Sequence, residues 1–185
     1  MSKIRPDTRE AIIEAAFQVF NETPGAKLED VAARAGVGRA TLHRHFSSRE
    51  TLMIELGRQA VRELDVAIEE ATKPAQTYSE GLRLALAAMV PLAQRQWFLS
   101  HEPVDRDPEI AGANEKGSEE LKAAIEAAKS EGAFGADVPT GWIASAYENL
   151  TYAAWTMVRD GEATLSQAAD LAWRTLTKGT GGDRK

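Results

Sequence analysis

Apolar residues recur along most of the chain at spacings of three and four, the pattern of helices that bury one face. No stretch alternates apolar and polar residues between turn signals, so the pattern predicts no strand. Pro91 should kink or break the helix predicted for residues 77–100, because proline lacks the N–H that a helix interior needs. We therefore expect an all-α protein. Its predicted helices cover residues 8–20, 28–35, 39–45, 49–72, 77–100, 108–113, 118–131, 139–159 and 165–178.

The first three predicted helices form a small group of their own. Helices 28–35 and 39–45 are separated by a tight turn containing glycine, which is typical of a helix-turn-helix. Leu42 and Phe46 are four residues apart and would pack the second of these helices inward. In a helix-turn-helix, the second helix lies in the major groove of DNA and its N-terminal residues meet base edges. We expect a DNA-binding head over residues 1–50 and a larger helical domain over residues 51–185, to which the family resemblance given below assigns ligand binding and dimerisation.

The distribution of charge supports this division. The chain carries a net charge of −6, but residues 1–50 hold eight basic and seven acidic residues, whereas residues 51–185 hold fourteen and twenty-one. No acid occurs between Val31 and Arg49, and binding to a polyanion depends on this local field rather than on the total charge. With Leu42 and Phe46 facing inward, the side chains left to face DNA are those of Arg39, Ala40, Thr41, His43, Arg44 and His45.

Other classes of protein find little support in the sequence. Cysteine is absent, no apolar run is long enough to span a bilayer, and the first residues do not form a signal peptide, so we expect a cytoplasmic protein without membrane contact. Nucleophile elbows and glycine-rich phosphate loops are missing, so we expect neither an enzyme nor a cofactor. His43 and His45 lie about 200° apart on a helix and make no metal pair.

The run TREAIIEAAFQVF, followed by PGAKLEDVAARAGVGRATLHRHFSSRETL, resembles the N-terminal domain of TetR-type transcriptional regulators. The resemblance covers about residues 8–52, close to a quarter of the chain. It depends on a spaced set of residues, namely Ala15-Ala16, Phe20, Gly25, Asp30-Val31-Ala32, Ala35-Gly36-Val37, Thr41-Leu42, His45-Phe46 and Leu52.

The resemblance implies roles for individual residues. Positions matching Arg39, Ala40 and Thr41 face base edges and nearby phosphates in the family, and those matching His43, His45 and Arg49 contact phosphate. Three residues depart from the common pattern: His43 stands where the family usually has Tyr, Arg49 where it usually has Lys, and Gly38 where Ser is frequent. His43 and Arg49 can still donate a hydrogen bond to a phosphate oxygen.

The aromatic residues of the second part have two interpretations. They pack a core and a dimer interface, or several of them line a cavity for a small molecule, as the resemblance implies. Under the second interpretation the candidate ligand-binding residues are Trp97, His101, Tyr147, Asn149 and Trp155. For His101 alone, an ordinary place in a surface loop is the alternative.

Together these observations predict a ligand-responsive repressor that binds a palindromic operator as a homodimer, through a four-helix bundle made by the last two long helices of each copy. The effector is an unidentified small molecule. It would act by tilting helix 49–72, which joins the head to the rest of the chain. The alternatives are a protein that binds DNA without regard to sequence, and a helical protein that binds a small molecule.

Overall fold

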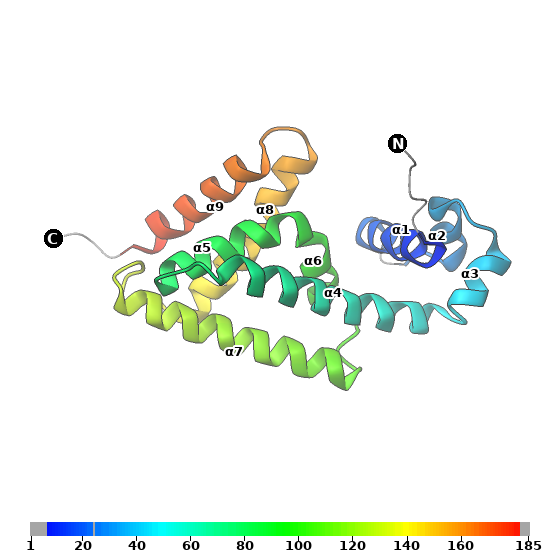
Figure 1. The fold of residues 1–185 in the computed structure, drawn as a ribbon, viewed down its shortest axis with the longest axis horizontal. Helices are drawn as coiled ribbons and strands as arrows, with labels where there is room; N and C mark the ends of the chain where they lie inside the picture. Colours follow the sequence, from blue (N-terminus) through cyan, green and yellow to red (C-terminus); the bar gives the residue numbers. More distant parts are fainter. Residues whose placement is uncertain (1–6, 24, 182–185) are drawn as a thin grey trace. The chain divides into compact units, whose positions relative to one another are not determined.

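The computed structural model describes residues 7–23 and 25–181, which form helices and no strand, so the all-α prediction is confirmed. None of the helices within these two ranges is apolar over a length that would cross a bilayer. The α-helices, labelled in Figure 1, are α1 (Thr8–Glu22), α2 (Leu28–Ala35), α3 (Arg39–His45), α4 (Arg49–Thr72), α5 (Tyr78–Met89), α6 (Ala93–His101), α7 (Pro108–Ser130), α8 (Thr140–Arg159) and α9 (Leu165–Thr180). A 3-10 turn, η1 (Val90–Leu92), lies between α5 and α6.

Local sequence signals set several helix ends, and α2, α3 and α4 have the predicted bounds. At the start of α9, the Thr164 hydroxyl accepts a hydrogen bond from the Gln167 N–H at 3.3 Å. The Gln167 side chain accepts one from the Thr164 N–H at 3.0 Å, which completes the capping box. Asp107 is a side-chain cap for the start of α7, because its carboxylate accepts hydrogen bonds from the N–H groups of Glu109 and Ile110.

Pro91 interrupts the helix predicted for residues 77–100. α5 ends at Met89, Val90–Leu92 form a 3-10 turn, and α6 begins at Ala93. The cause is local, because proline cannot donate to the preceding turn and its ring crowds the carbonyl group there. The break separates two helices that belong to different compact units of the chain.

The prediction of two helices between residues 108 and 131 is wrong, because α7 continues through Gly112 and Gly117. α9 likewise runs past Gly179, its predicted end, to Thr180. A glycine costs a helix interior only about 1 kcal/mol relative to alanine, so neighbouring residues can carry the helix across it. None of these three glycines takes the positive φ with which Gly36 ends α2.

The described residues form two compact units. The head unit consists of residues up to Val61 together with Gln94–Ala111, and the body unit consists of Arg62–Ala93 together with residues from Gly112 onward. α4 and α7 each contribute to both units. The head unit therefore contains α6 in addition to the three short helices, while the predicted division after residue 50 stays a prediction.

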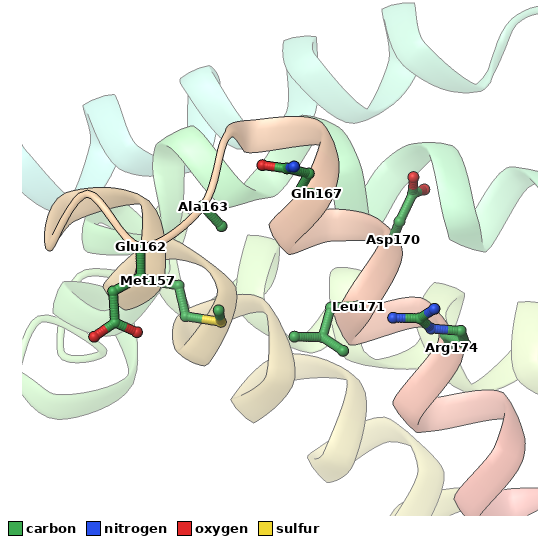
Figure 2. A pocket seen from close by; sticks show the side chains of 7 residues that line it. All are labelled: Met157, Glu162, Ala163, Gln167, Asp170, Leu171 and Arg174. Carbon is green, nitrogen blue, oxygen red and sulfur yellow. The ribbon is translucent and has the colours of Figure 1, made fainter.

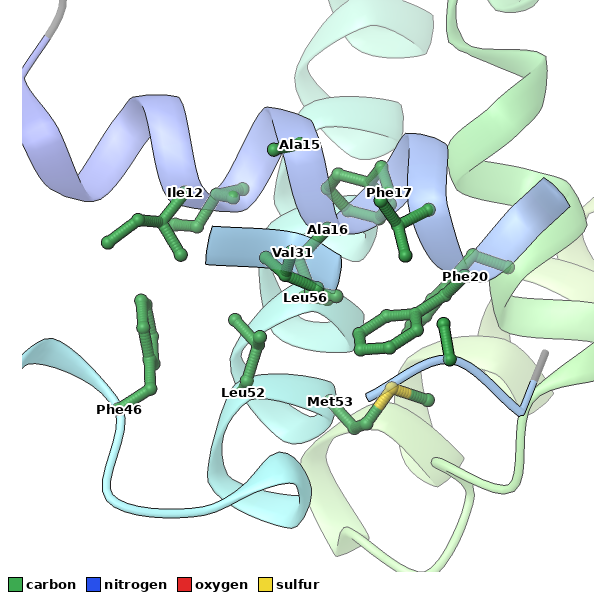
Figure 3. Packing of buried hydrophobic residues seen from close by; sticks show 14 of the residues in the cluster. Ile12, Ala15, Ala16, Phe17, Phe20, Val31, Phe46, Leu52, Met53 and Leu56 are labelled. Atoms are coloured by element: carbon green, nitrogen blue, oxygen red, sulfur yellow. The ribbon is translucent and has the colours of Figure 1, made fainter. Parts of the chain in front are cut away.

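The head unit has a single apolar core, shown in Figure 3. The predicted stripe of α1 lies in it, since Ile12, Ile13, Ala16, Phe17 and Phe20 are all buried. Side chains of α2, of α4 and of the segment after α3 close the core from the other sides. They are Val31, Leu52, Met53, Leu56 and Phe46.

Helix α6 covers one side of this core. The Phe98 ring meets the Phe17 ring edge-on, with 5.4 Å between the ring centres. Arg95 places its guanidinium 4.4 Å above the centre of the Phe17 ring, and it also forms an ion pair with Glu14. These contacts make α6 part of the packing that holds α1 in place.

In the body unit, α8 and α9 pack along each other and α5 lies against both. The buried Tyr147 hydroxyl donates a hydrogen bond to the Leu82 carbonyl oxygen at 2.8 Å, which fastens α8 to α5. Glu131, just after α7, accepts hydrogen bonds from the N–H groups of Tyr78 and Ser79, both at 2.9 Å. Its carboxylate thus caps the N-terminus of α5 from another part of the chain.

Candidate nucleic-acid interface

A three-residue turn joins α2 to α3 and sets the angle between them. Gly36 has φ of 67°, in the left-handed region that glycine adopts without steric cost. The Gly36 N–H donates to the Ala33 carbonyl at 3.2 Å and the Val37 N–H donates to the Ala32 carbonyl at 3.0 Å, closing the end of α2. Val37 is half-buried against the core, so the turn is held at its centre.

The orientation of α3 follows from its two apolar residues. Leu42 is fully buried and Phe46 is 2% exposed, so this side of α3 and its end face the head core. Thr41 is half-buried at the edge of this contact. The opposite side is exposed and carries Arg39, Ala40, His43, Arg44 and His45.

The exposed basic side chains differ in their contacts. Arg39, the first residue of α3, lies 3.4 Å from the Glu29 carboxylate of α2, measured from Nη1 to Oε1. His45 has its ring 6.5 Å from that of Phe46. Within the described residues, no ion pair or hydrogen bond is formed by the side chains of His43 and Arg44, which leaves both available to a phosphate oxygen.

Arg49 is held more firmly than sequence reasoning suggested. Its guanidinium lies 4.7 Å from the centre of the Phe20 ring, and its Nε donates to the Ala26 carbonyl oxygen at 3.3 Å. A nearly buried carboxylate, that of Glu102, lies 4.0 Å away. Burial raises the pKa of Glu102, while the charge of Arg49 opposes this rise. Arg49 thus ties the start of α4 to α1, and its phosphate contact stays a proposal.

Sequence reasoning missed two acidic residues in this region, Glu29 and Glu102. Glu29 is just outside the acid-free stretch and pairs with Arg39, ten residues further on. Glu102 pairs with Arg49 across 53 residues, and no sequence pattern joins the two positions.

The five candidate ligand-binding residues are divided between the two units. Trp97 and His101 belong to the head unit, where their rings stack 3.6 Å apart at an angle of 17°. In the body unit, Tyr147 is buried, whereas Asn149 is exposed and donates to the carbonyl oxygen one turn before it. Trp155 is half-buried, and the guanidinium of Arg159 lies 4.9 Å from the centre of its ring. An effector contact at these residues stays a prediction.

A pocket of the body unit lies elsewhere, between the end of α8 and the first turns of α9 (Figure 2). It measures about 450 Å³, and most of the side chains around it are exposed. Three apolar side chains and four charged or amide groups share its walls, so it offers both dispersion contacts and hydrogen bonds. Its lining residues are Met157, Glu162, Ala163, Gln167, Asp170, Leu171 and Arg174.

A packed helix-turn-helix with an exposed basic second helix, together with a larger helical unit, defines the class of helix-turn-helix transcription regulators. Residues 12–56 match the family model described as "Bacterial regulatory proteins, tetR family". The chain is also 32% identical over 179 residues to the HTH-type transcriptional repressor LfrR of Mycolicibacterium smegmatis, covering 96% of this chain and 93% of LfrR. The chain belongs to the TetR family, whose members regulate transcription and are not enzymes.

Solved structures agree with this assignment. The crystal structure of LfrR from Mycobacterium smegmatis in complex with proflavine is 32% identical, with a TM-score of 0.70, and the match covers 93% of this chain and 95% of that one. The ketosteroid transcriptional regulator KstR2 of Mycobacterium tuberculosis has a TM-score of 0.76 over 97% of both chains. At 19% identity, the likeness to KstR2 shows a shared fold alone.

Proposed function

We propose that the protein is a ligand-responsive repressor that binds a palindromic operator as a homodimer. The observation that carries this proposal is the exposed basic side of α3 on a fully packed helix-turn-helix, with no acid between Val31 and Arg49. LfrR, which is 32% identical over nearly the whole chain, is a repressor, and this supports repression of transcription over activation. Arg39, Ala40 and Thr41 would meet base edges, and His43, Arg44, His45 and Arg49 would contact phosphates.

The surface of α8 and α9 supports a dimer. Trp142 of α8 is 67% exposed, and Leu165 and Leu171 of α9 are 47% and 38% exposed. Exposed large apolar side chains on two helices that pack along each other provide surface that an interface between proteins can cover. We propose that α8 and α9 of two copies pack into a four-helix bundle, which would place two copies of α3 on one DNA duplex.

For the effector, we propose a planar aromatic cation. LfrR has been crystallised with proflavine, a compound of this class, and residues 51–185 of the present chain carry seven more acidic than basic residues. α4 contributes residues to both units, so an effector that prefers one orientation of α4 would shift the population of DNA-binding dimers. A coupling of about 1–3 kcal/mol would change the affinity for DNA roughly 5- to 150-fold.

Selection of bound fragments from random duplex DNA tests the proposal. We expect a palindrome whose half-sites are centred about 34–36 Å apart, or a multiple of that distance. Addition of proflavine to the selected complex should release the DNA. Equal binding to selected and random duplexes would favour a protein indifferent to sequence. Failure to bind any duplex, with ligand binding retained, would favour a small-molecule-binding protein, and either result would refute the proposal.

The dimer has a separate test. Trp142→Glu places a charge in the proposed interface and should yield a monomer in sedimentation experiments, with loss of tight operator binding. Ser118→Glu, on the exposed part of α7, is the matched control and should remain dimeric. If both variants sediment as the parent protein does, the interface lies elsewhere.

A further inference from the structure

The basic surface of the head contains one acidic side chain whose position calls for explanation. Glu29 lies in the first turn of α2 and is half exposed, with its carboxylate 3.4 Å from Arg39. The neighbouring Asp30 has a structural task, because its carboxylate accepts a hydrogen bond from the Lys27 N–H at 2.8 Å and so closes the start of α2. Glu29, by contrast, forms its ion pair with Arg39, which lies on the proposed DNA-facing side.

The pair itself adds little to the stability of the fold. The side chains of Arg39 and Glu29 are 72% and 51% exposed, and an exposed ion pair of this kind is worth little in water. Arg39 also stands at the N-terminus of α3, where the helix dipole disfavours a cation. The effect of Glu29 therefore concerns the direction and availability of the Arg39 guanidinium.

We propose that Glu29 is a positioning residue for DNA recognition, which keeps Arg39 from phosphates and directs it to a guanine base. This inference rests on the proposed function. A guanidinium has five N–H donors in a plane, so one edge can meet a carboxylate while another donates two hydrogen bonds to O6 and N7 of guanine. Because Glu29 is anionic, it also repels phosphates and weakens binding to every duplex, and only a duplex with the guanine offsets this loss through the directed Arg39 contact.

The two effects of Glu29 have opposite signs, and this makes the proposal testable. Loss of the negative charge should strengthen binding to random DNA and at the same time weaken the choice between base pairs. A residue that only supported the fold would weaken binding to all duplexes alike. A residue that only changed the net charge would leave the choice between base pairs intact.

The experiment uses the full chain and three duplexes: the selected operator, the same operator with one G·C pair of each half-site exchanged, and a random sequence. The Arg39→Ala variant first identifies the G·C pair that Arg39 contacts. Exchange of that pair should lower the affinity of the parent protein and leave the affinity of the variant unchanged. Glu29→Gln is then compared with the parent protein. Glu22→Gln is the matched control, since Glu22 pairs with Arg34 of α2 at 2.8 Å, is also exposed, and changes the net charge equally.

For Glu29→Gln we expect about two- to five-fold tighter binding to the random duplex, the effect of removing one exposed repulsive charge. The slope of log K against log salt concentration should steepen by about 0.9, because Arg39 becomes free to contact one phosphate. Preference for the G·C pair should fall about five-fold or more, the lower end of what a bidentate contact supplies. Glu22→Gln should keep the preference of the parent protein.

The inference is overturned if Glu29→Gln keeps the full preference, if it binds random DNA more weakly, or if Arg39→Ala relaxes no G·C pair. Circular dichroism and thermal unfolding of each variant separate these outcomes from a loss of structure. A parent protein that prefers no duplex refutes the proposed function and this inference with it. A parent protein with a clear operator and an unchanged Glu29→Gln variant refutes the inference alone.

Discussion

The contact between α4 and the start of α7 depends on the absence of a side chain at Gly57. A methyl group built on Gly57 would lie 2.4 Å from Cδ1 of Ile110 and 3.4 Å from both Ile110 Cγ1 and Val104 Cβ. Ile110 is completely buried, so its terminal methyl has little free space to move into. Gly57→Ala should therefore destabilise the head unit, and Ile110→Val, which removes the Cδ1 methyl, should relieve the clash.

The magnitudes follow from two opposing terms. Alanine in place of a helical glycine contributes about 1 kcal/mol of stability, whereas overpacking of a filled core costs about 1–3 kcal/mol. Gly57→Ala should thus destabilise by up to about 2 kcal/mol. Ile110→Val alone should cost about 0.5–1.5 kcal/mol. In the double variant the clash is absent, so it should be more stable than the sum of the single changes by the clash energy, about 1–3 kcal/mol.

Hydrogen exchange of the α4 and α7 amides, together with urea unfolding at one protein concentration, measures these changes. Gly117→Ala is the matched control, because a methyl added to this helical glycine would meet nothing within 4 Å beyond the neighbouring backbone of its own helix and should give the full benefit of alanine. If Gly57→Ala stabilises its helix as Gly117→Ala does, or if the effects of Gly57→Ala and Ile110→Val simply add, the packing argument is wrong.

Three further predictions concern polar contacts. The hydrogen bond from Arg58 lowers the pKa of Asp107, so its contribution to stability is present above the ordinary aspartate pKa and is lost as the pH falls through the lowered value. Asp107→Asn should therefore lower the melting temperature at pH 7. The difference in melting temperature between the variant and the parent protein should become smaller below about pH 4. Tyr147→Phe removes the hydroxyl hydrogen bond to the Leu82 carbonyl and should cost about 0.5–1.5 kcal/mol in urea unfolding. Glu131→Gln removes the anionic cap of α5 and should cost about 0.3–1 kcal/mol, seen as faster hydrogen exchange in its first turn.

Each of these predictions has an outcome that contradicts it. A melting difference for Asp107→Asn that is the same at pH 7 and pH 4 would show that the charge of the carboxylate is not what matters. A Tyr147→Phe variant with the same free energy of unfolding as the parent protein would show that the hydrogen bond to Leu82 does not stabilise the fold. Unchanged exchange in α5 after Glu131→Gln would mean that other groups hold the start of that helix.

The helix-turn-helix could be predicted from sequence because its determinants are local. Gly36 ends α2, Leu42 and Phe46 orient α3, and each signal acts within a few residues. α7 was predicted as two helices, over residues 108–113 and 118–131, whereas it continues through Gly112 and Gly117, because a glycine without positive φ costs too little to stop a helix.

The side-chain partners at the recognition surface could not be predicted, because they depend on tertiary packing. Arg39 meets Glu29 only once α3 has folded back on α2, and Arg49 meets Glu102 only once α6 has packed on α1. On α8, Trp142 is exposed, whereas Tyr147, on another side of the same helix, is buried. A sequence pattern does not distinguish a core face from a face that meets a partner.

The packing of α6 on Phe17 has a consequence for the construction of hybrid regulators. Joining the first fifty residues of this chain to a foreign sensor module would remove Phe98 and Arg95 from the aromatic ring that they cover. Grafts that also transplant residues 51–61 and 94–111 retain that cover. A hybrid regulator should therefore exchange both segments of the head unit together, because a single junction along the chain separates them.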